Sequence, residues 1–182
     1  MNVALGSAAL LFGLGASVLG AGTLAVGLVK KRPKLLVLGR SYAFLAFLGA
    51  IVAFAVMERA LITRDFTVAY VAENGSSKTP AIYNFATLWA ALEGSILLWA
   101  LILTGYLMAM MRKFRHRQSD PLVGWANLTM LVVCIFFFGL MVTVAKPFVP
   151  FSPTPGFDGP GPNPLLQNHI LMAFHPPMLY LG

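Results

Sequence analysis

Three histidines are the side chains best suited to binding a metal ion, and their settings differ. His116 lies in a basic run and is expected to be solvated, whereas His169 and His175 flank the start of the last apolar segment. Pro176 and Pro177 follow His175, and a residue before proline is pushed towards extended backbone, so a rigid break is expected there. A neutral imidazole fixed at an apolar boundary can bind a haem iron. On spacing alone, a structural role for His175 is favoured over iron binding, and both remain open.

Glu93 is a second candidate, because it is the one acid in a long apolar stretch at 82–111. If that stretch is one helix, Glu93 lies about 12 Å below its end, with Trp89 and Trp99 on the same helix. Arg40 is a poor partner, because it can snorkel to the other end of the bundle. An acid inside a membrane is costly unless it is paired, hydrated or protonated. Glu93 is therefore either part of a cofactor pocket or partner contact, or a hydrogen-bonded carboxyl that holds helices together.

The common catalytic patterns are missing from the sequence. It contains no glycine-rich phosphate loop, no GxSxG or HExxH string and no close pair of carboxylates. Cys134 is the one cysteine and lies in an apolar run, which excludes an intrachain disulfide and indicates a small core residue. The sequence therefore gives little basis for a hydrolase or a catalytic thiol.

The composition is that of an integral membrane protein. Of the 182 residues, 58% are hydrophobic and 10% are charged, and the mean hydropathy is +0.79. Typical soluble domains have about 45–50% apolar and about 25% charged residues, so this chain could not cover a soluble surface. The net charge of +7 comes from basic residues at the ends of apolar segments, where they set topology. A nucleic-acid partner is not expected.

The apolar pattern predicts an all-α fold, a polytopic integral membrane helix bundle in a single transmembrane domain over 1–182. Four segments are long enough to cross a bilayer core of about 30 Å, and a fifth begins without completing a crossing. The expected ranges are 3–29, 35–57, 82–111 and 122–144 for the complete helices, 58–81 and 145–169 for two long loops, and near 176 for the start of the fifth helix.

Basic residues predict the orientation of the bundle. The turns at 30–40 and 112–117 hold five and four Lys or Arg and no acid, whereas 58–84 and 145–169 hold three and one, mixed with acids. The positive-inside rule places the first two turns in the cytoplasm. The amino terminus and both long loops are then expected outside, on the periplasmic or extracytoplasmic side of the inner (cytoplasmic) membrane.

The final segment suggests that the chain does not act alone. Its thirteen residues at 170–182 would make a helix of about 20 Å, too short to cross a membrane. We expect either that the chain is a fragment or that a second polypeptide supplies the rest of the crossing.

The first helix carries small residues at intervals of four, a pattern that allows another helix to approach closely. That helix could belong to this chain or to a partner. The small residues are Ala9, Gly13, Ser17, Ala21 and Ala25.

Four strings in the sequence resemble the amino-terminal part of the CcmF family, the haem-handling proteins of cytochrome c maturation. The strings are DFTVAYVA at 65–72, LEGSILLW at 92–99, NPLLQNH at 163–169 and HPPMLYLG at 175–182. The resemblance covers most of the chain from Tyr42 onward. The chain differs from many relatives at Leu92, where they carry a polar residue.

The resemblance implies a subunit of the cytochrome c haem lyase, which attaches chaperone-delivered haem to the CxxCH thiols of apocytochrome c. The implied partners are the remaining part of the lyase, a periplasmic haem chaperone, apocytochrome c and the lipid bilayer, and the haem is b-type until it is attached. His175 is implied as an axial ligand of the haem iron. Tyr180, about one helical turn on, is expected from its position to line the pocket. Asp65, Phe66 and Tyr70 are expected to shape the outer loop. The family's tryptophan-rich segment and other histidine ligands have no match here, so this part is expected to be inactive alone.

The alternative function belongs to another class. In it the chain is a non-catalytic membrane subunit of a transporter or energy-converting complex, with Glu93 as a proton relay and the small-residue stripe as a docking face.

Overall fold

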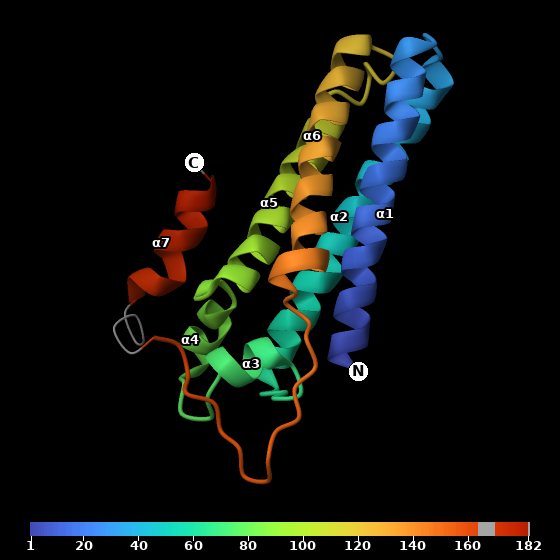
Figure 1. Ribbon diagram of the computed structural model, residues 1–182. Coiled ribbons are helices and arrows are strands. Elements are labelled where there is room, and N and C mark those ends of the chain that lie inside the picture. Colours follow the sequence, from blue (N-terminus) through green and yellow to red (C-terminus); the bar gives the residue numbers. More distant parts are fainter. Residues whose placement is uncertain (164–169, 182) are drawn as a thin grey trace.

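The computed structural model describes residues 1–163 and 170–181, without the side chain of residue 82. His169, most of the NPLLQNH string and Gly182 therefore lie outside the described residues. Four long helices form the bundle (Figure 1), and each is long and apolar enough to cross a membrane, which confirms the predicted all-α bundle. They are α1 (Asn2–Val29), α2 (Pro33–Ile62), α5 (Leu92–Lys113) and α6 (Pro121–Leu140), which the π-helical turn η2 (Met141–Ala145) continues.

Within residues 1–163 and 170–181, three short helical segments and one longer helix accompany the bundle. They are α3 (Ala69–Asn74), α4 (Ala81–Ala86), the 3-10 turn η1 (Thr87–Trp89) and α7 (Ile170–Leu181). Figure 1 shows α7 beside α5, with its carboxyl-terminal end about halfway along the bundle.

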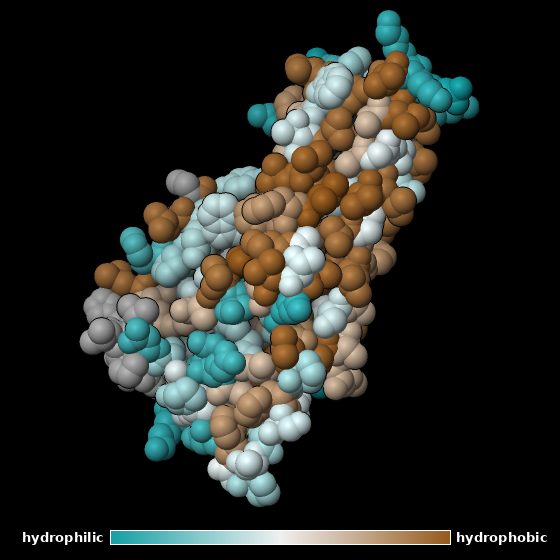
Figure 2. Space-filling view, viewed as in Figure 1, coloured by the Kyte–Doolittle hydropathy of each residue, from teal (hydrophilic) through white to brown (hydrophobic). Residues whose placement is uncertain are grey.

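The bundle has two chemically different ends. We call the end formed by residues 30–34 and 112–120 the basic end; Lys31 of the first turn and Ser119 of the second line one cavity there. We call the end that carries Met1, α3, α4 and residues 146–163 the loop end (Figure 1). Between them the face seen in Figure 2 is largely apolar along α1 and α6. The two basic turns therefore share one end, as the sequence predicts.

The small-residue stripe of α1 packs inside this chain. A Cβ atom on Gly49 of α2 would lie 2.9 Å from the Ala9 carbonyl oxygen and 2.9 Å from the Gly13 Cα, so the two backbones are nearly in contact. At Gly13 itself, the ring of Phe138 from α6 occupies the space where a side chain would stand. Ser17 is fully buried, and its hydroxyl donates to the Gly13 carbonyl at 2.8 Å. The stripe is thus used by α2 and α6 rather than left for a partner.

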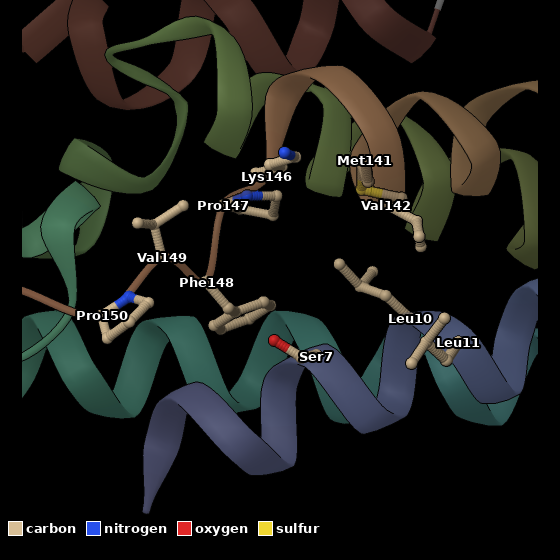
Figure 3. Close-up of a pocket in the computed structure, with 10 residues that line it drawn as sticks. All are labelled: Ser7, Leu10, Leu11, Met141, Val142, Lys146, Pro147, Phe148, Val149 and Pro150. Atoms are coloured by element: carbon tan, nitrogen blue, oxygen red, sulfur yellow. The ribbon is translucent and has the colours of Figure 1, made fainter.

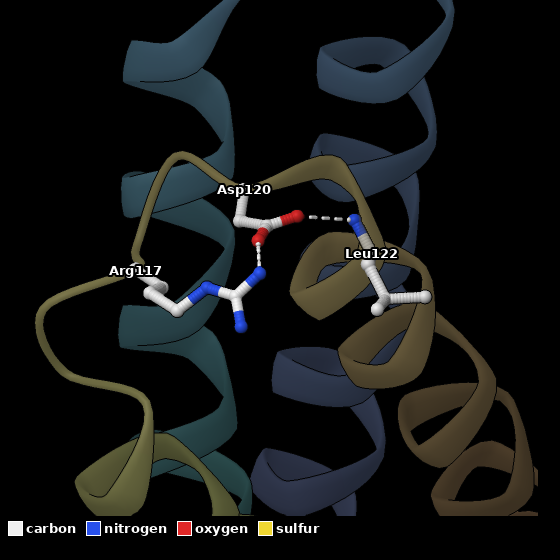
Figure 4. Close-up of polar contacts among 3 residues, drawn as sticks. All are labelled: Arg117, Asp120 and Leu122. Carbon is white, nitrogen blue, oxygen red and sulfur yellow. Dashed lines mark hydrogen bonds and ion pairs between the residues drawn. The ribbon is translucent and has the colours of Figure 1, made fainter.

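The start of α6 is fixed by a side-chain cap (Figure 4). The Asp120 carboxylate accepts a hydrogen bond from the Leu122 backbone N–H at 2.9 Å and forms an ion pair with Arg117, and Pro121 opens the helix. A carboxylate at this position satisfies an amide that has no partner inside the helix. The turn between α5 and α6 is therefore tightly held at the basic end.

The predicted single helix over 82–111 is wrong. The chain forms α4 and η1, breaks at Ala91 with φ −130° and ψ 169°, and starts again as α5. The Tyr70 hydroxyl stabilises the break, because it donates to the carbonyl oxygens of Thr87 at 2.9 Å and Leu88 at 2.8 Å. Trp89 and Trp99 consequently lie on different elements, and Glu93 lies in the first turn of α5 rather than deep within a helix.

The predicted start of the fifth helix near 176 is also wrong. Residue 170 is already helical, and Pro176 and Pro177 lie inside α7 instead of opening it. His175 is therefore in helical backbone and not at an extended break. The Trp89 indole N–H donates to the Met172 carbonyl, the carbonyl that Pro176 leaves without a backbone donor.

The two long loops pair with each other over the loop end. Val68 and Pro150 form an antiparallel bridge, flanked by hydrogen bonds from Ala69 N to Val149 O at 2.9 Å and from Phe151 N to Thr67 O at 2.8 Å. Further along, the Asp158 carboxylate accepts from the Ser77 backbone N–H at 2.7 Å. This pairing covers the ends of the long helices.

Candidate functional site

The helix that carries His175 has two different faces. One face packs on the bundle and consists of the buried Met172 and four half-buried residues at 173, 176, 177 and 180. The other face is exposed, and it combines the His175 imidazole with four apolar side chains. These are Leu171, Phe174, Met178 and Leu179.

The His175 ring is the polar group of an otherwise apolar face. It has no hydrogen-bond or ion-pair partner among the residues that the structure describes. An imidazole that is neither buried nor committed to a protein partner keeps a nitrogen lone pair for a metal. The large apolar side chains around it, Phe174 with 60% and Met178 with 64% exposure, suit the flat apolar ring of a porphyrin better than water.

Three contacts fix α7 against η1 and α5. The indole N–H of Trp89 donates to the Met172 carbonyl oxygen at 2.8 Å. The ring of Tyr180 packs edge-on against Trp99 with centroids 5.5 Å apart, and the Tyr106 hydroxyl donates to the Leu181 carbonyl at 3.1 Å. Tyr180 therefore faces the bundle, whereas His175 faces away from it. The structure does not bring the two predicted pocket residues together on one surface.

The turn before α5 is held by a buried tyrosine and a glycine. Tyr70 is 3% exposed, and burial raises the pKa of its hydroxyl above the ordinary value, so the group stays protonated and donates to the two carbonyls of η1. Gly94 lies against the same turn: a Cβ atom there would overlap the Leu88 carbonyl oxygen and lie 2.6 Å from the Tyr70 hydroxyl oxygen. The glycine of the LEGSILLW string is thus required by a close backbone approach.

Asp65 and Phe66 stabilise the start of the long loop. The Asp65 carboxylate accepts hydrogen bonds from the Asn2 side chain at 2.7 Å and from the Thr67 hydroxyl at 2.6 Å. Partial burial acts to raise the pKa of Asp65, but the hydrogen bonds from Thr67 and Asn2 outweigh it and the pKa lies below its ordinary value. Phe66 packs edge-on against Phe157 of the other loop, with centroids 5.5 Å apart.

Glu93 lines a small polar cavity at the loop end. The cavity has a volume of about 160 Å³, and Glu73, Lys146 and Tyr70 also line it. Glu93 is half-buried there. This position at the mouth of the bundle differs from the buried mid-helix position that the sequence suggests.

A second cavity shares Lys146, Pro147 and Val149 with the first as lining residues (Figure 3). Its volume is about 260 Å³, and apolar side chains of α1, η2 and the following loop line it, among them Leu10, Val142 and Phe148. His175 is not among the described residues that line either cavity. The exposed face of α7, rather than a closed pocket, is therefore the candidate site.

Two buried charged residues were not anticipated from the sequence. Glu58 lies on α2, which extends to Ile62 rather than ending near residue 57; it is 7% exposed, and both carboxylate oxygens lack a hydrogen-bond partner among the described residues. Arg40 is largely buried: it is 8% exposed, and its Nη2 donates to the Met111 carbonyl near the basic end of α5 at 2.7 Å. The signal for Glu58 was its place directly after an apolar run with no turn residue between.

Comparison with known proteins identifies the relatives of this chain. No protein-family model matches it. It is 35% identical over 156 residues to the cytochrome c-type biogenesis protein CcmF of Escherichia coli K12, covering 86% of this chain and 24% of that protein. It is 34% identical over all 182 residues to the cytochrome c-type biogenesis protein CycK of Rhizobium meliloti, covering 26% of that protein.

A solved structure agrees with these matches. The cytochrome c heme lyase CcmF superposes with a TM-score of 0.82 at 36% identity, and the match covers all of this chain and 28% of the solved one. The chain spans about a quarter of the length of the curated relatives it matches. Over that quarter, sequence and fold agree, and the chain belongs to the CcmF family.

Proposed function

We propose that this chain acts in cytochrome c maturation, as the part of a haem lyase that holds haem for attachment to the CxxCH thiols of apocytochrome c. The observation that carries the proposal is the placement of His175. Its imidazole stands exposed on an apolar helix face without a partner among the described side chains, which is what an incoming haem iron needs. The names of the relatives, cytochrome c-type biogenesis protein and cytochrome c heme lyase, support the same assignment.

In this proposal haem is the substrate, b-type until it is attached, and the chain positions it. The His175 nitrogen supplies an axial ligand, and Phe174 and Met178 offer apolar surface to the macrocycle. Trp89 and Trp99 contact the opposite, packed face of α7 and hold this helix on the bundle. Pro176 and Pro177 lie on the packed face directly after the ligand, where their rings fix the backbone φ angle but remove two helix hydrogen bonds.

The orientation of the chain in the membrane is inferred from the basic end. We place residues 30–34 and 112–120 in the cytoplasm and the loop end outside the inner membrane, where a periplasmic haem chaperone, apocytochrome c and the rest of the lyase would meet α7. The test is thiol labelling in intact cells, after Cys134 is replaced by alanine. Lys78→Cys should react with a membrane-impermeant maleimide and Lys31→Cys should not; the reverse pattern would overturn this sidedness.

The transporter alternative has little support. A proton relay needs an acid within the membrane path, and Glu93 lies half-buried at the loop end beside Glu73 and Lys146. The small-residue stripe that would dock a partner is occupied by α2 and α6. The transporter hypothesis predicts that Glu93→Gln damages proton-coupled transport, whereas the proposed function predicts no such effect.

The function is tested by His175→Ala in cells that carry the complete lyase, with covalent haem on a reporter cytochrome c as the readout. We expect attachment to fall to background. His116→Ala is the matched control, because His116 is exposed at the basic end and should not affect attachment. Normal attachment with His175→Ala would contradict the proposal.

A further inference from the structure

The two prolines of α7 create a hydrogen-bond deficit in that helix. In an α-helix the carbonyl of residue i accepts from the N–H of residue i+4. Proline has no N–H, so Pro176 leaves the Met172 carbonyl without a donor and Pro177 leaves the Ala173 carbonyl without one. A helix that must keep its course through this point needs a donor from outside.

Trp89 supplies that donor at one of the two carbonyls. Its indole N–H lies 2.8 Å from the Met172 carbonyl oxygen, and the contact is closed to water, since Trp89 is 7% and Met172 is 6% exposed. The indole ring is itself held edge-on against Phe85, with centroids 5.1 Å apart. A side chain from η1 therefore takes the place of a backbone amide in a helix 83 residues further along the chain.

We propose that Trp89 is the positioning residue for His175. The residue it braces is Met172, one turn before the imidazole, and the amide it replaces belongs to Pro176, the residue directly after the imidazole. Without the indole N–H, the buried Met172 carbonyl would have to turn towards another donor, and the helix would bend or rotate at that point. Either movement changes where the His175 ring points.

The bracing connects the turn just before the LEGSILLW string with the helix that carries most of the HPPMLYLG string. Trp89 is presented by the η1 turn, whose carbonyls bond to Tyr70 and whose close approach requires Gly94. In this proposal the η1 turn thereby sets the direction of α7. The effect of Trp89 on haem rests on the proposed function of His175. The replacement of the Pro176 amide by the Trp89 indole N–H does not depend on that function.

The test uses the complete lyase assembly and restores the missing amide elsewhere. Trp89→Phe keeps a ring but removes the donor, and it should weaken haem retention about tenfold, the usual effect of leaving one buried carbonyl unpaired. Adding Pro176→Ala returns an N–H at the position that faces Met172 and should recover most of the loss. Adding Pro177→Ala, the matched control, returns an N–H that faces Ala173 and should not.

Amide hydrogen exchange of α7 is read beside the haem absorption spectrum, because it does not depend on haem. We expect faster exchange at the amides of residues 172–175 with Trp89→Phe, and recovery with Pro176→Ala but not with Pro177→Ala. Should Trp89→Phe fail to accumulate, accumulation becomes the readout, and Pro176→Ala should restore it selectively.

The two ideas fail in different ways. If His175→Ala leaves haem retention unchanged, the proposed function is wrong, and the exchange data still decide the role of Trp89. If Trp89→Phe changes neither exchange nor haem retention, or if both proline replacements rescue equally, the positioning role of Trp89 is overturned.

Discussion

Gly94→Ala offers a demanding test of the turn that precedes α5. The added methyl group would overlap the Leu88 carbonyl oxygen and lie 2.6 Å from the Tyr70 hydroxyl oxygen. Neither neighbour can give way easily, because the first is backbone and the second is a buried hydroxyl that bonds to that backbone. Overpacking of this kind costs about 1–3 kcal/mol, and displacing Tyr70 adds about 1 kcal/mol for each hydrogen bond that is lost.

Gly105→Ala is the matched control on the same helix. A Cβ atom there meets only the edge of the Phe47 ring, at 3.9 Å, which is an ordinary contact. Replacing a mid-helix glycine by alanine normally stabilises a helix by about 0.5–1 kcal/mol. The two variants therefore differ in sign although the chemical change is the same.

The assay is reversible denaturation of the complete lyase in detergent, followed by tryptophan fluorescence. We expect Gly94→Ala to lower the unfolding free energy by about 2–4 kcal/mol and Gly105→Ala to leave it unchanged or raised. Because η1 also presents Trp89, the Gly94 variant should loosen α7 as well. Equal stability of the two variants would refute the claim that Gly94 is needed for close approach.

Three further predictions concern other buried or loop groups. Tyr70→Phe should lower stability by about 1–2 kcal/mol in the same assay, because two buried carbonyls of η1 lose their donor; an unchanged midpoint would contradict this. Glu58→Leu should raise the thermal midpoint, because it removes a buried carboxyl whose oxygens have no partner among the described residues. A clear loss of stability would contradict this and would indicate that Glu58 has a bound partner. The pKa of Asp65 is lowered on folding, so its contribution to stability is present above its ordinary value of 3.8 and is lost as the pH falls through the lower folded value. Asp65→Asn should remove this loss of stability at acid pH. The readout is the rate of protease cleavage in the loop that follows Asp65, measured as a function of pH, and the same pH profile in the variant would count against the Asp65 contacts.

The number of membrane helices could be predicted from the sequence because the length of an apolar run is fixed by bilayer thickness. The same signal could not locate the break at Ala91. No glycine or proline stands at the break itself, and the need for Gly94 three residues later becomes visible only once Tyr70, distant in sequence, is seen to bond to the carbonyls of Thr87 and Leu88. A tertiary contact there overrides local helix preference.

The candidate site was predicted in part. The HPP string singled out His175, but the sequence rule for a residue before proline gave the wrong backbone at that position. The rule states a steric preference of the residue before proline rather than a prohibition, and His175 keeps helical backbone in α7. A proline inside an apolar helix leaves one backbone carbonyl without its hydrogen-bond donor, so the sequence could have prompted a search for a tryptophan that donates to it. The sequence alone does not identify which tryptophan this is.

The central claim is that the His175 nitrogen binds haem iron. The most direct measurement is the absorption spectrum of haem on the purified complete lyase, for the unaltered protein and for His175→Ala, each with and without added free imidazole. The account predicts that the variant loses the spectrum of the ligated haem and that free imidazole restores it. A spectrum that His175→Ala leaves unchanged, with no response to imidazole, would contradict the account.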